Sequence, residues 1–526
     1  MRISPFLKQT FVMLLVVVAS IIGCRFTNGL FSILIVLLGI VFALQGKAGW
    51  TIVCYMQLFL LRLFTTALIG KNLYFTFSAR IGSVFLVLVM LLQSGSSRKM
   101  HRIPINWLWA YVFCAVLSSL DGWFPMISFL KLFNFAMLLL GVYFVGQSMQ
   151  QSDRDLENVR AALMAFSILV IGGSLVARFI PEIGYSMELA SAERYGNYLI
   201  GEEVLTLEKT TLFSGVLFHS QALGPVVSFF AIWVLCDMLF VERRMAKLHL
   251  FLLAIAPFLL WMTRSRTAFV VIIGTLLVMY LVGLPMASLS PVRKARLRMF
   301  FTVLIVLTVL GLVMSQIAGG AVSKWLRKTD DLAGDNRSLT TAVTDTRMGL
   351  IMRDMADFQR NPMFGKGFQV SYWHPAAYRA GAISIWSAPI EKGPLPVMIL
   401  GEGGILGEIM FVIFLVAFVA FCLKRKYAAM LTLFSCFLLS NLGETTFFSP
   451  SGVGGIGWIV FAVGGACIDW ISQRQTEHRF DMSVRWGDIP IDEHGMPRMY
   501  EKLVEDQSGR KRVVEEQRVI KRYGRG

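Results

Sequence analysis

Residues 387–411 read SAPIEKGPLPVMILGEGGILGEIMF, and this stretch joins a polar segment to an apolar one. Glu391 and Lys392 stand just before a Gly-Pro pair, after which the sequence turns apolar. Glu402 and Glu408 lie inside the apolar part. This part is long enough to cross a bilayer core of about 30 Å. The stretch therefore predicts a membrane-spanning helix with charged residues at its entrance and within it.

The composition of the whole chain excludes an ordinary soluble domain. Of 526 residues, 56% are hydrophobic and only 16% are charged, and the mean hydropathy is +0.64. A soluble domain has about 25% charged residues. We therefore predict an all-α polytopic membrane protein, with a bundle of about 12–14 transmembrane helices. The candidate spans are 11–23, 29–45, 50–69, 77–95, 106–120, 123–147, 159–180, 221–240, 246–263, 266–287, 298–318, 396–422, 427–443 and 450–470.

Basic residues in the short loops predict the orientation of the chain in the membrane. One side carries clusters such as Arg243–Arg244 and Lys424–Lys426, whereas the short loops of the other side carry few basic residues, such as Arg25 and Lys71. Basic loops stay in the cytoplasm, so we predict that both termini are cytoplasmic. The same rule accounts for the net charge of +17, and no nucleic-acid partner is expected.

The spans and the polar segments between them predict the organisation of the chain. Two long segments lie on the outer side, opposite the cytoplasm, and long loops often carry function. In the larger one, the apolar spacing after Arg347 predicts an amphipathic helix that ends at Asn361-Pro362. The predicted regions are N-terminal helices 1–180, a first outer loop 181–220, helices 221–318, a large and partly helical outer loop 319–395, C-terminal helices 396–470 and a polar cytoplasmic tail 471–526.

Four arginines at the predicted outer face are candidate anion-binding residues: Arg264, Arg266, Arg347 and Arg353. A guanidinium group offers a planar fork of donors that matches phosphate oxygens two at a time. These arginines would suit a lipid-linked diphosphate. The alternative is that their side chains only reach the lipid headgroups.

Three residues on the outer side are candidate bases. His219 and His374 are the two histidines expected there, and histidine can accept a proton near neutral pH. Glu391 is the third, with Lys392 beside it; the alternative is an ordinary ion pair at the start of a helix. The seven cysteines form no CxxC pair, so we predict neither a disulfide framework nor a metal site.

Four segments occur in the order typical of one family. They are GVLFHSQALGPVVSFF (215–230), MTRSRTAFVVIIG (262–274), TRMGLIMRDMADFQRNPMFGKGF (346–368) and LPVMILGEGGILGEIMFVIFL (395–415). Together they resemble the O-antigen ligase and polymerase superfamily, bacterial inner-membrane glycosyltransferases that act on glycans carried by undecaprenyl diphosphate. The resemblance covers about residues 210–425.

The resemblance implies a mechanism and a set of site residues. Arg266 and Arg347 would hold the diphosphate of the donor, with Arg264, Arg353 and Lys392 as further binding residues. Their positive charge would stabilise the leaving group, so that neither a metal nor a cofactor is required. A base would deprotonate an acceptor hydroxyl, which attacks the anomeric carbon on the face opposite the leaving group.

The sequence departs from the family at the position of the usual catalytic histidine. That residue lies about nine positions before the glutamate of Glu-x-Gly-Ile-Leu-Gly, and counting back from Glu402 reaches Gly393. Glu391 is therefore the first choice of base, followed by His374 and His219.

We accordingly expect a multi-pass protein of the bacterial inner membrane that polymerises or ligates lipid-linked glycans at the periplasmic face. The missing histidine favours a polymerase over a ligase. Its partners would be the lipid-linked donor, a glycan or lipid acceptor, the bilayer, and a flippase or chain-length regulator in contact with it. One alternative is a transporter or flippase, for which Arg62, Lys131 and Glu408 are the charges at membrane depth. The other is a scaffold without catalysis, in which the candidate residues would be dispensable.

Overall fold

The computed structural model of the chain describes most of its helices. Arg264, His374, Glu391 and Lys392 fall outside the described residues, as does most of the predicted span 298–318. Residues 1–472 form one compact unit and residues 473–526 form another. The residues described are 4–69, 73–93, 105–122, 124–149, 152–189, 209–242, 246–263, 265–287, 289, 291, 294–302, 339–370, 394–443, 445–450, 452–483, 503–505 and 511–513.

The described helices confirm an all-α polytopic membrane protein. Seven of them are long and apolar enough to cross a membrane, and six shorter apolar helices accompany them in the part of the chain that was searched. These helices correspond to the predicted spans other than 298–318. The amphipathic helix predicted from Arg347 is also present, and it begins earlier, at Leu339.

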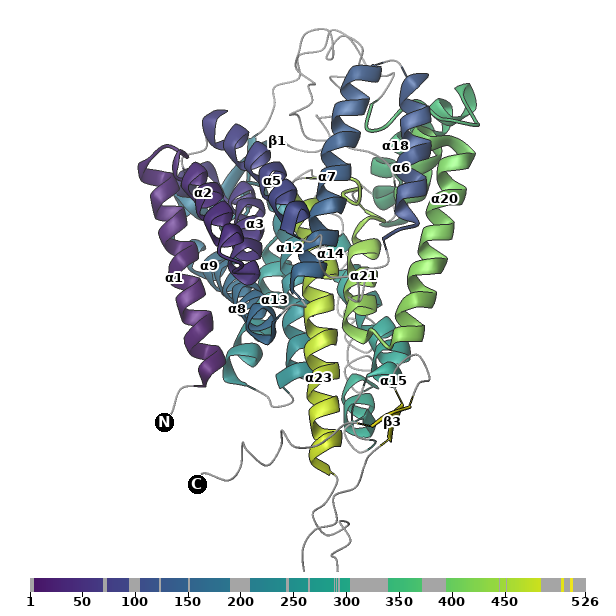
Figure 1. Cartoon of the computed structure of the whole chain (residues 1–526). Coiled ribbons are helices and arrows are strands. Elements are labelled where there is room, and N and C mark those ends of the chain that lie inside the picture. The colour runs from purple at the N-terminus through teal and green to yellow at the C-terminus, as the bar shows by residue number, and fades with distance from the viewer. Residues whose placement is uncertain are drawn as a thin grey trace, which may run out of the picture. The chain divides into compact units, whose positions relative to one another are not determined.

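The helices follow one another along the chain with short connections (Figure 1). Four segments, labelled η, are π-helical. In order the helices are α1 Pro5–Phe26, α2 Phe31–Leu44, α3 Ala48–Leu63, α4 Thr66–Ile69, α5 Leu73–Gln93, α6 Leu108–Leu120, α7 Pro125–Met149, α8 Asp153–Ser167, η2 Ile168–Gly172, α9 Gly173–Ala177, α10 Pro181–Gly184, α12 Ser220–Cys236, η3 Asp237–Glu242, α13 Lys247–Met262, α14 Arg266–Val278, η4 Met279–Gly283, α15 Leu284–Met286, α18 Leu339–Arg360, α20 Leu395–Arg425, α21 Ala428–Ser440, α22 Gly452–Trp458, η5 Ile459–Gly464 and α23 Gly465–Ser483.

Two short antiparallel ribbons add to the helices, and neither was predicted. In the first outer loop, β1 Tyr185–Leu189 pairs with β2 Lys209–Phe213. In the tail, β3 Leu503–Glu505 pairs with β4 Lys511–Val513. Pairing of this kind depends on partners distant in sequence, which apolar periodicity does not reveal.

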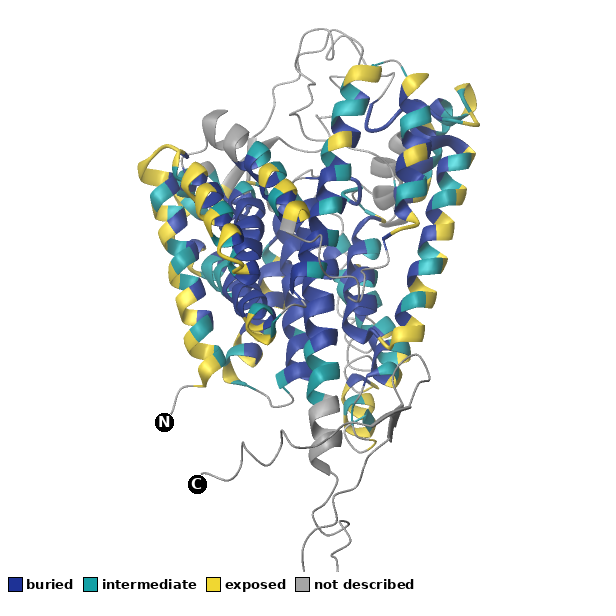
Figure 2. Ribbon diagram, viewed as in Figure 1, coloured by how far each residue is buried: buried dark blue, intermediate teal, exposed yellow. Residues whose placement is uncertain are grey.

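Burial separates central helices from peripheral ones within the first unit. Figure 2 shows α12 almost entirely buried, whereas α1, α2 and α20 carry many exposed positions. The exposed positions of these peripheral helices are apolar, as in Leu37 of α2 and Val416 of α20. Exposed apolar rows of this size fit contact with lipid chains.

Neighbouring helices run in opposite directions, which gives the bundle two ends. We call the end at which α3, α8 and α21 begin the basic end, because Lys47, Arg154 and Lys424 lie there. There the Gly49 N–H donates to Asp155 Oδ1 at 2.7 Å and joins the starts of α3 and α8. We call the opposite end, at which α12, α14 and α20 begin, the loop end.

Candidate functional site

A break in α20 is the first feature of the loop end. Gly404 has φ +62° and ψ −164°, a conformation open almost only to glycine. The segment that follows α18, residues 361–370, lies against this break, and we call it the NP segment after Asn361-Pro362. The Ile405 N–H donates to Pro362 O at 2.9 Å. The NP segment thus accepts a bond that an unbroken α20 would satisfy internally.

The two backbones approach so closely that only glycines fit between them. The Lys366 N–H donates to Gly401 O at 3.0 Å. A Cβ atom on Gly365 would lie 2.4 Å from the carbonyl carbon of Glu402, and one on Gly404 would lie 2.4 Å from Met363 O. The glycines of both matched motifs therefore serve this contact.

A buried ionic cluster ties the NP segment to α18. The Lys366 ammonium group lies 3.1 Å from Asp354 Oδ1 and forms a second ion pair with Asp357. Burial disfavours the charged form of Lys366, but attraction to the two carboxylates outweighs it and holds the pKa of Lys366 above the ordinary 10.5. We did not predict this cluster. Its one sequence signal is the spacing of the two aspartates, three apart on the helix, which places them on one face.

Side chains from other helices fix the remainder of the NP segment. Each bond joins it to an element that is distant in sequence, so the segment holds one position at the loop end. The bonds run from Asn361 Nδ2 to Asp121 Oδ2 (2.7 Å), from Ser128 Oγ to Phe368 O (3.0 Å), from Lys131 Nζ to Gln369 O (3.2 Å) and from Gln369 Nε2 to Phe448 O (2.7 Å).

The two glutamates of α20 differ in their surroundings. Glu402 is buried at the break, and its carbonyl oxygen accepts hydrogen bonds from Ser118 Oγ and from the Gly367 N–H. This supports a structural role for Glu402. Glu408 is half-buried and interacts electrostatically with the buried Tyr111, whose ring packs on Gly407.

His219 is a helix cap in this structure. It is the N-cap of α12, and its Nδ1 atom accepts a hydrogen bond from the Gln221 N–H at 3.1 Å. A neutral imidazole whose Nδ1 accepts a bond carries its proton on Nε2. His219 could therefore take a further proton at Nδ1 only by giving up this bond.

The starts of three helices meet around Arg266, the first residue of α14. Gly224 of α12 packs against Ser265, and a Cβ atom there would lie 2.6 Å from that serine. Gly443, after α21, packs equally closely on Thr267. Asn441 O accepts a bond from the Leu395 N–H at 3.1 Å, so the start of α20 belongs to the same group.

Helix starts present free N–H groups and a partial positive charge, which favour anions. This group of helix starts brings Arg266 near the end of the predicted outer loop, since Lys392 stands three residues before Leu395 in the sequence. Arg347 and Arg353 lie on α18, and Arg353 is half-buried. The α18 helix contacts α20 at Gly401, where a Cβ atom would lie 3.0 Å from Asp354 O.

Two further arginines lie in the loop-end half of the bundle. Arg62 is in the last turn of α3, and it interacts electrostatically with Arg80 of α5. The end of α3 is bonded to the residue before His219, because the Phe218 N–H donates to Leu63 O at 3.0 Å. We did not single out Arg80, although an arginine inside the predicted span 77–95 is a signal in itself.

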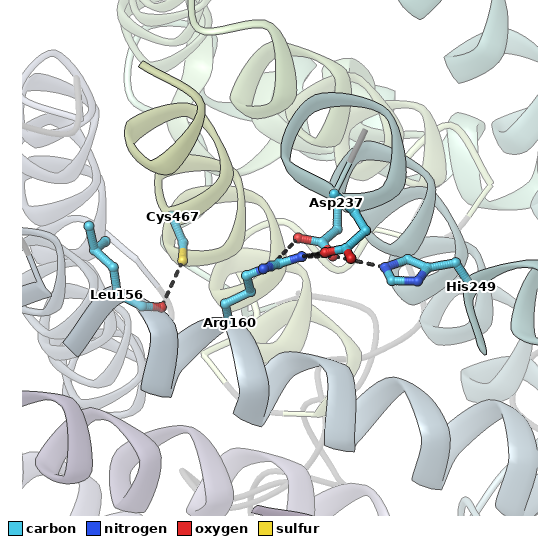
Figure 3. Close-up of polar contacts among 6 residues, drawn as sticks. Leu156, Arg160, Asp237, His249 and Cys467 are labelled. Atoms are coloured by element: carbon cyan, nitrogen blue, oxygen red, sulfur yellow. Dashed lines mark hydrogen bonds and ion pairs between the residues drawn. The ribbon is translucent and has the colours of Figure 1, made fainter. Parts of the chain in front are cut away.

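A separate polar network lies at the basic end (Figure 3). Arg160 of α8 binds Asp237 through two bonds, Nε to Oδ1 at 2.6 Å and Nη2 to Oδ2 at 2.9 Å, and it also reaches Glu242 at 2.9 Å. His249 Nε2 lies 2.9 Å from Asp237 Oδ2 on the other side. We expected Arg160 and His249 in cytoplasmic loops, but the structure buries both within helices. This network joins α8, η3 and α13 and contains none of the predicted site residues.

Within the described ranges, no group of three or more His, Cys, Asp or Glu side chains is placed to hold a metal ion. Comparison of the chain with family models, with curated proteins and with solved structures finds no match.

Proposed function

We propose that this chain is a glycosyltransferase of the bacterial inner membrane that polymerises or ligates glycans carried on undecaprenyl diphosphate at the periplasmic face. In this proposal the loop end faces the periplasm and both termini are cytoplasmic. The observation that carries it is the meeting of the starts of α12, α14 and α20 around Arg266. Three helix starts and an arginine form a place suited to a diphosphate.

The proposed reaction is a single displacement at the anomeric carbon of the donor. The acceptor hydroxyl loses its proton to a base, its oxygen forms the new bond to the anomeric carbon, and the bond from that carbon to the diphosphate oxygen breaks. Undecaprenyl diphosphate leaves with the electron pair. Arg266 and Arg347 bind the charge that develops on it, with Arg264, Arg353 and Lys392 as further contacts, so the reaction is metal-independent.

Glu391 is the first choice of base, because it stands four residues before Leu395 in the sequence. His374 is the second choice. His219 is the third, since its Nδ1 atom already caps α12.

The direct test supplies purified protein in lipid nanodiscs with an undecaprenyl-diphosphate oligosaccharide and an acceptor, and measures longer or conjugated glycans. Arg266→Ala and Arg347→Ala should each abolish product, because the leaving group loses its stabilisation. Arg25→Ala is the matched control, since Arg25 is an exposed arginine in the last turn of the peripheral α1. Unchanged turnover in both site variants would contradict the proposal.

A transporter of lipid-linked glycans is the second candidate, and the buried Arg160–Asp237–His249 network favours it. Ionisable residues inside membrane helices are common along transport pathways. The two candidates separate in proteoliposomes that carry labelled lipid-linked glycan in one leaflet. A transporter moves the label between leaflets without changing glycan length, whereas the enzyme changes glycan length.

A further inference from the structure

Lys366 is the one residue that bonds both α18 and α20. Its main-chain N–H donates to Gly401 O of α20, and its side chain binds Asp354 and Asp357 of α18. All three side chains of the cluster are buried, with Lys366 only 2% exposed. The spacing between the two helices at the loop end therefore depends on this lysine.

Ionic contacts of this kind fix one register between two helices. If α18 slid by one turn, both aspartates would move about 5.4 Å along the helix axis and leave the lysine. Buried charges without a partner are strongly unfavourable, so the displaced arrangements are excluded. Apolar packing alone discriminates less between neighbouring registers, because it is not directional.

The register of α18 decides where its arginines lie. Arg353 is next to Asp354 in the sequence, and position 347 lies seven residues before position 354. Seven residues make about two helical turns, so positions 347 and 354 share one face of α18. The contact that holds Asp354 thus also sets position 347 relative to α20.

We propose that Lys366 is a positioning residue for donor binding: it holds α18 against the break in α20 so that Arg347 and Arg353 meet the diphosphate of the lipid-linked donor. This inference rests on the proposed function for its ligand. The holding of α18 can be tested independently of that function.

The first measurement uses paired spin labels on α18 and α20. Met352→Cys and Val416→Cys place the labels at exposed positions, and all seven natural cysteines are buried. Lys366→Met leaves two carboxylates facing each other, so the distance distribution between the labels should broaden and shift. Lys366→Arg keeps the charge and should retain the wild-type distribution. The triple variant K366M/D354N/D357N removes every charge of the cluster and keeps the test open if Lys366→Met does not fold; its distribution should also broaden.

Lys131→Met is the matched control for the loss of a buried lysine. Lys131 binds the same NP segment through Gln369 O and forms no ion pair with α18 among the residues that the structure describes. Its distance distribution should match that of the wild type. An unchanged distribution in both Lys366→Met and the triple variant would overturn the inference.

The second measurement is steady-state kinetics with the lipid-linked donor. A positioning role in binding predicts that KM for the donor rises about 10- to 100-fold in the triple variant, while kcat changes little. A fall in kcat at unchanged KM would overturn the role in donor binding. Absence of turnover in the wild-type protein would overturn that role together with the proposed function, and the label distances would then still decide whether Lys366 holds α18.

Discussion

At the scale of single residues, His219 illustrates how a candidate base can be occupied by structure. Its Nδ1 atom accepts the Gln221 N–H and satisfies one of the free donors at the start of α12. Asparagine is among the best residues at this position and can make the same bond, whereas alanine cannot. The two substitutions therefore separate a capping role from a catalytic one.

For a capping role we expect His219→Asn to retain wild-type thermal stability and turnover. His219→Ala should lose about 1 kcal/mol of stability, because the N–H is left without this acceptor. The measurements are thermal unfolding in detergent and glycan transfer in nanodiscs. Loss of turnover in both variants at unchanged unfolding temperature would instead identify His219 as the base.

At the scale of elements, the π-helical turn η3 explains how Arg160 binds two carboxylates. Asp237 and Glu242 are five residues apart, which in an α-helix would point them about 140° away from each other. In a π-helix the hydrogen bonds join residues i and i+5, so five residues make about one turn. Both carboxylates then lie on one face, and Arg160 Nη2 reaches both.

The break in α20 gives a prediction at the same scale. Gly404→Ala should prevent the native contact, because a Cβ atom would meet Met363 O at 2.4 Å and because alanine disfavours φ +62°. Gly407→Ala is the matched control on the same helix, since its Cβ would lie no closer than 3.6 Å to any neighbour. We expect Gly404→Ala to lower stability by about 3 kcal/mol or more and Gly407→Ala by less than about 1 kcal/mol.

Size-exclusion profiles and thermal unfolding in detergent measure both variants. Equal unfolding temperatures for Gly404→Ala and the wild type would show that α20 can close its break without loss.

The break also shows why some elements were predicted and others were not. The end of α18 at Arg360 was predictable, because Asn361-Pro362 acts locally. The span 396–422 was predicted as one continuous helix, since apolar length alone was visible. Its break at Gly404 depends on bonds to residues about forty positions earlier, and so does the pairing of Lys366 with α18. Pairings between distant residues of this kind leave no periodic signal in one sequence.

At the scale of the whole molecule, the membrane character follows from composition, because long apolar runs have few other uses in a folded chain. The candidate site was predicted only as a set of residue types at one face. The structure adds that Arg266 starts one of three helices that meet, and that α18 is held by a buried lysine. Neither arrangement is contained in the spacing of the arginines.

The two ends of the bundle give the last prediction, which concerns orientation. The basic end carries Lys424 in an exposed position, and the loop end carries Met363, whose side chain is also exposed. If the positive-inside rule holds for this chain, the loop end faces the periplasm and the basic end faces the cytoplasm. Because all seven natural cysteines are buried, a membrane-impermeant maleimide should leave the wild-type protein unlabelled.

In spheroplasts, we expect this maleimide to label Met363→Cys and to leave Lys424→Cys unlabelled until the membrane is permeabilised. The two variants control for each other, since each should react in detergent. Labelling of Lys424→Cys alone in sealed spheroplasts would invert the orientation. It would also place the Arg266 site on the cytoplasmic side, where a polymerase of exported lipid-linked glycans could not use it. Orientation is thus a test of the proposed function that requires no substrate.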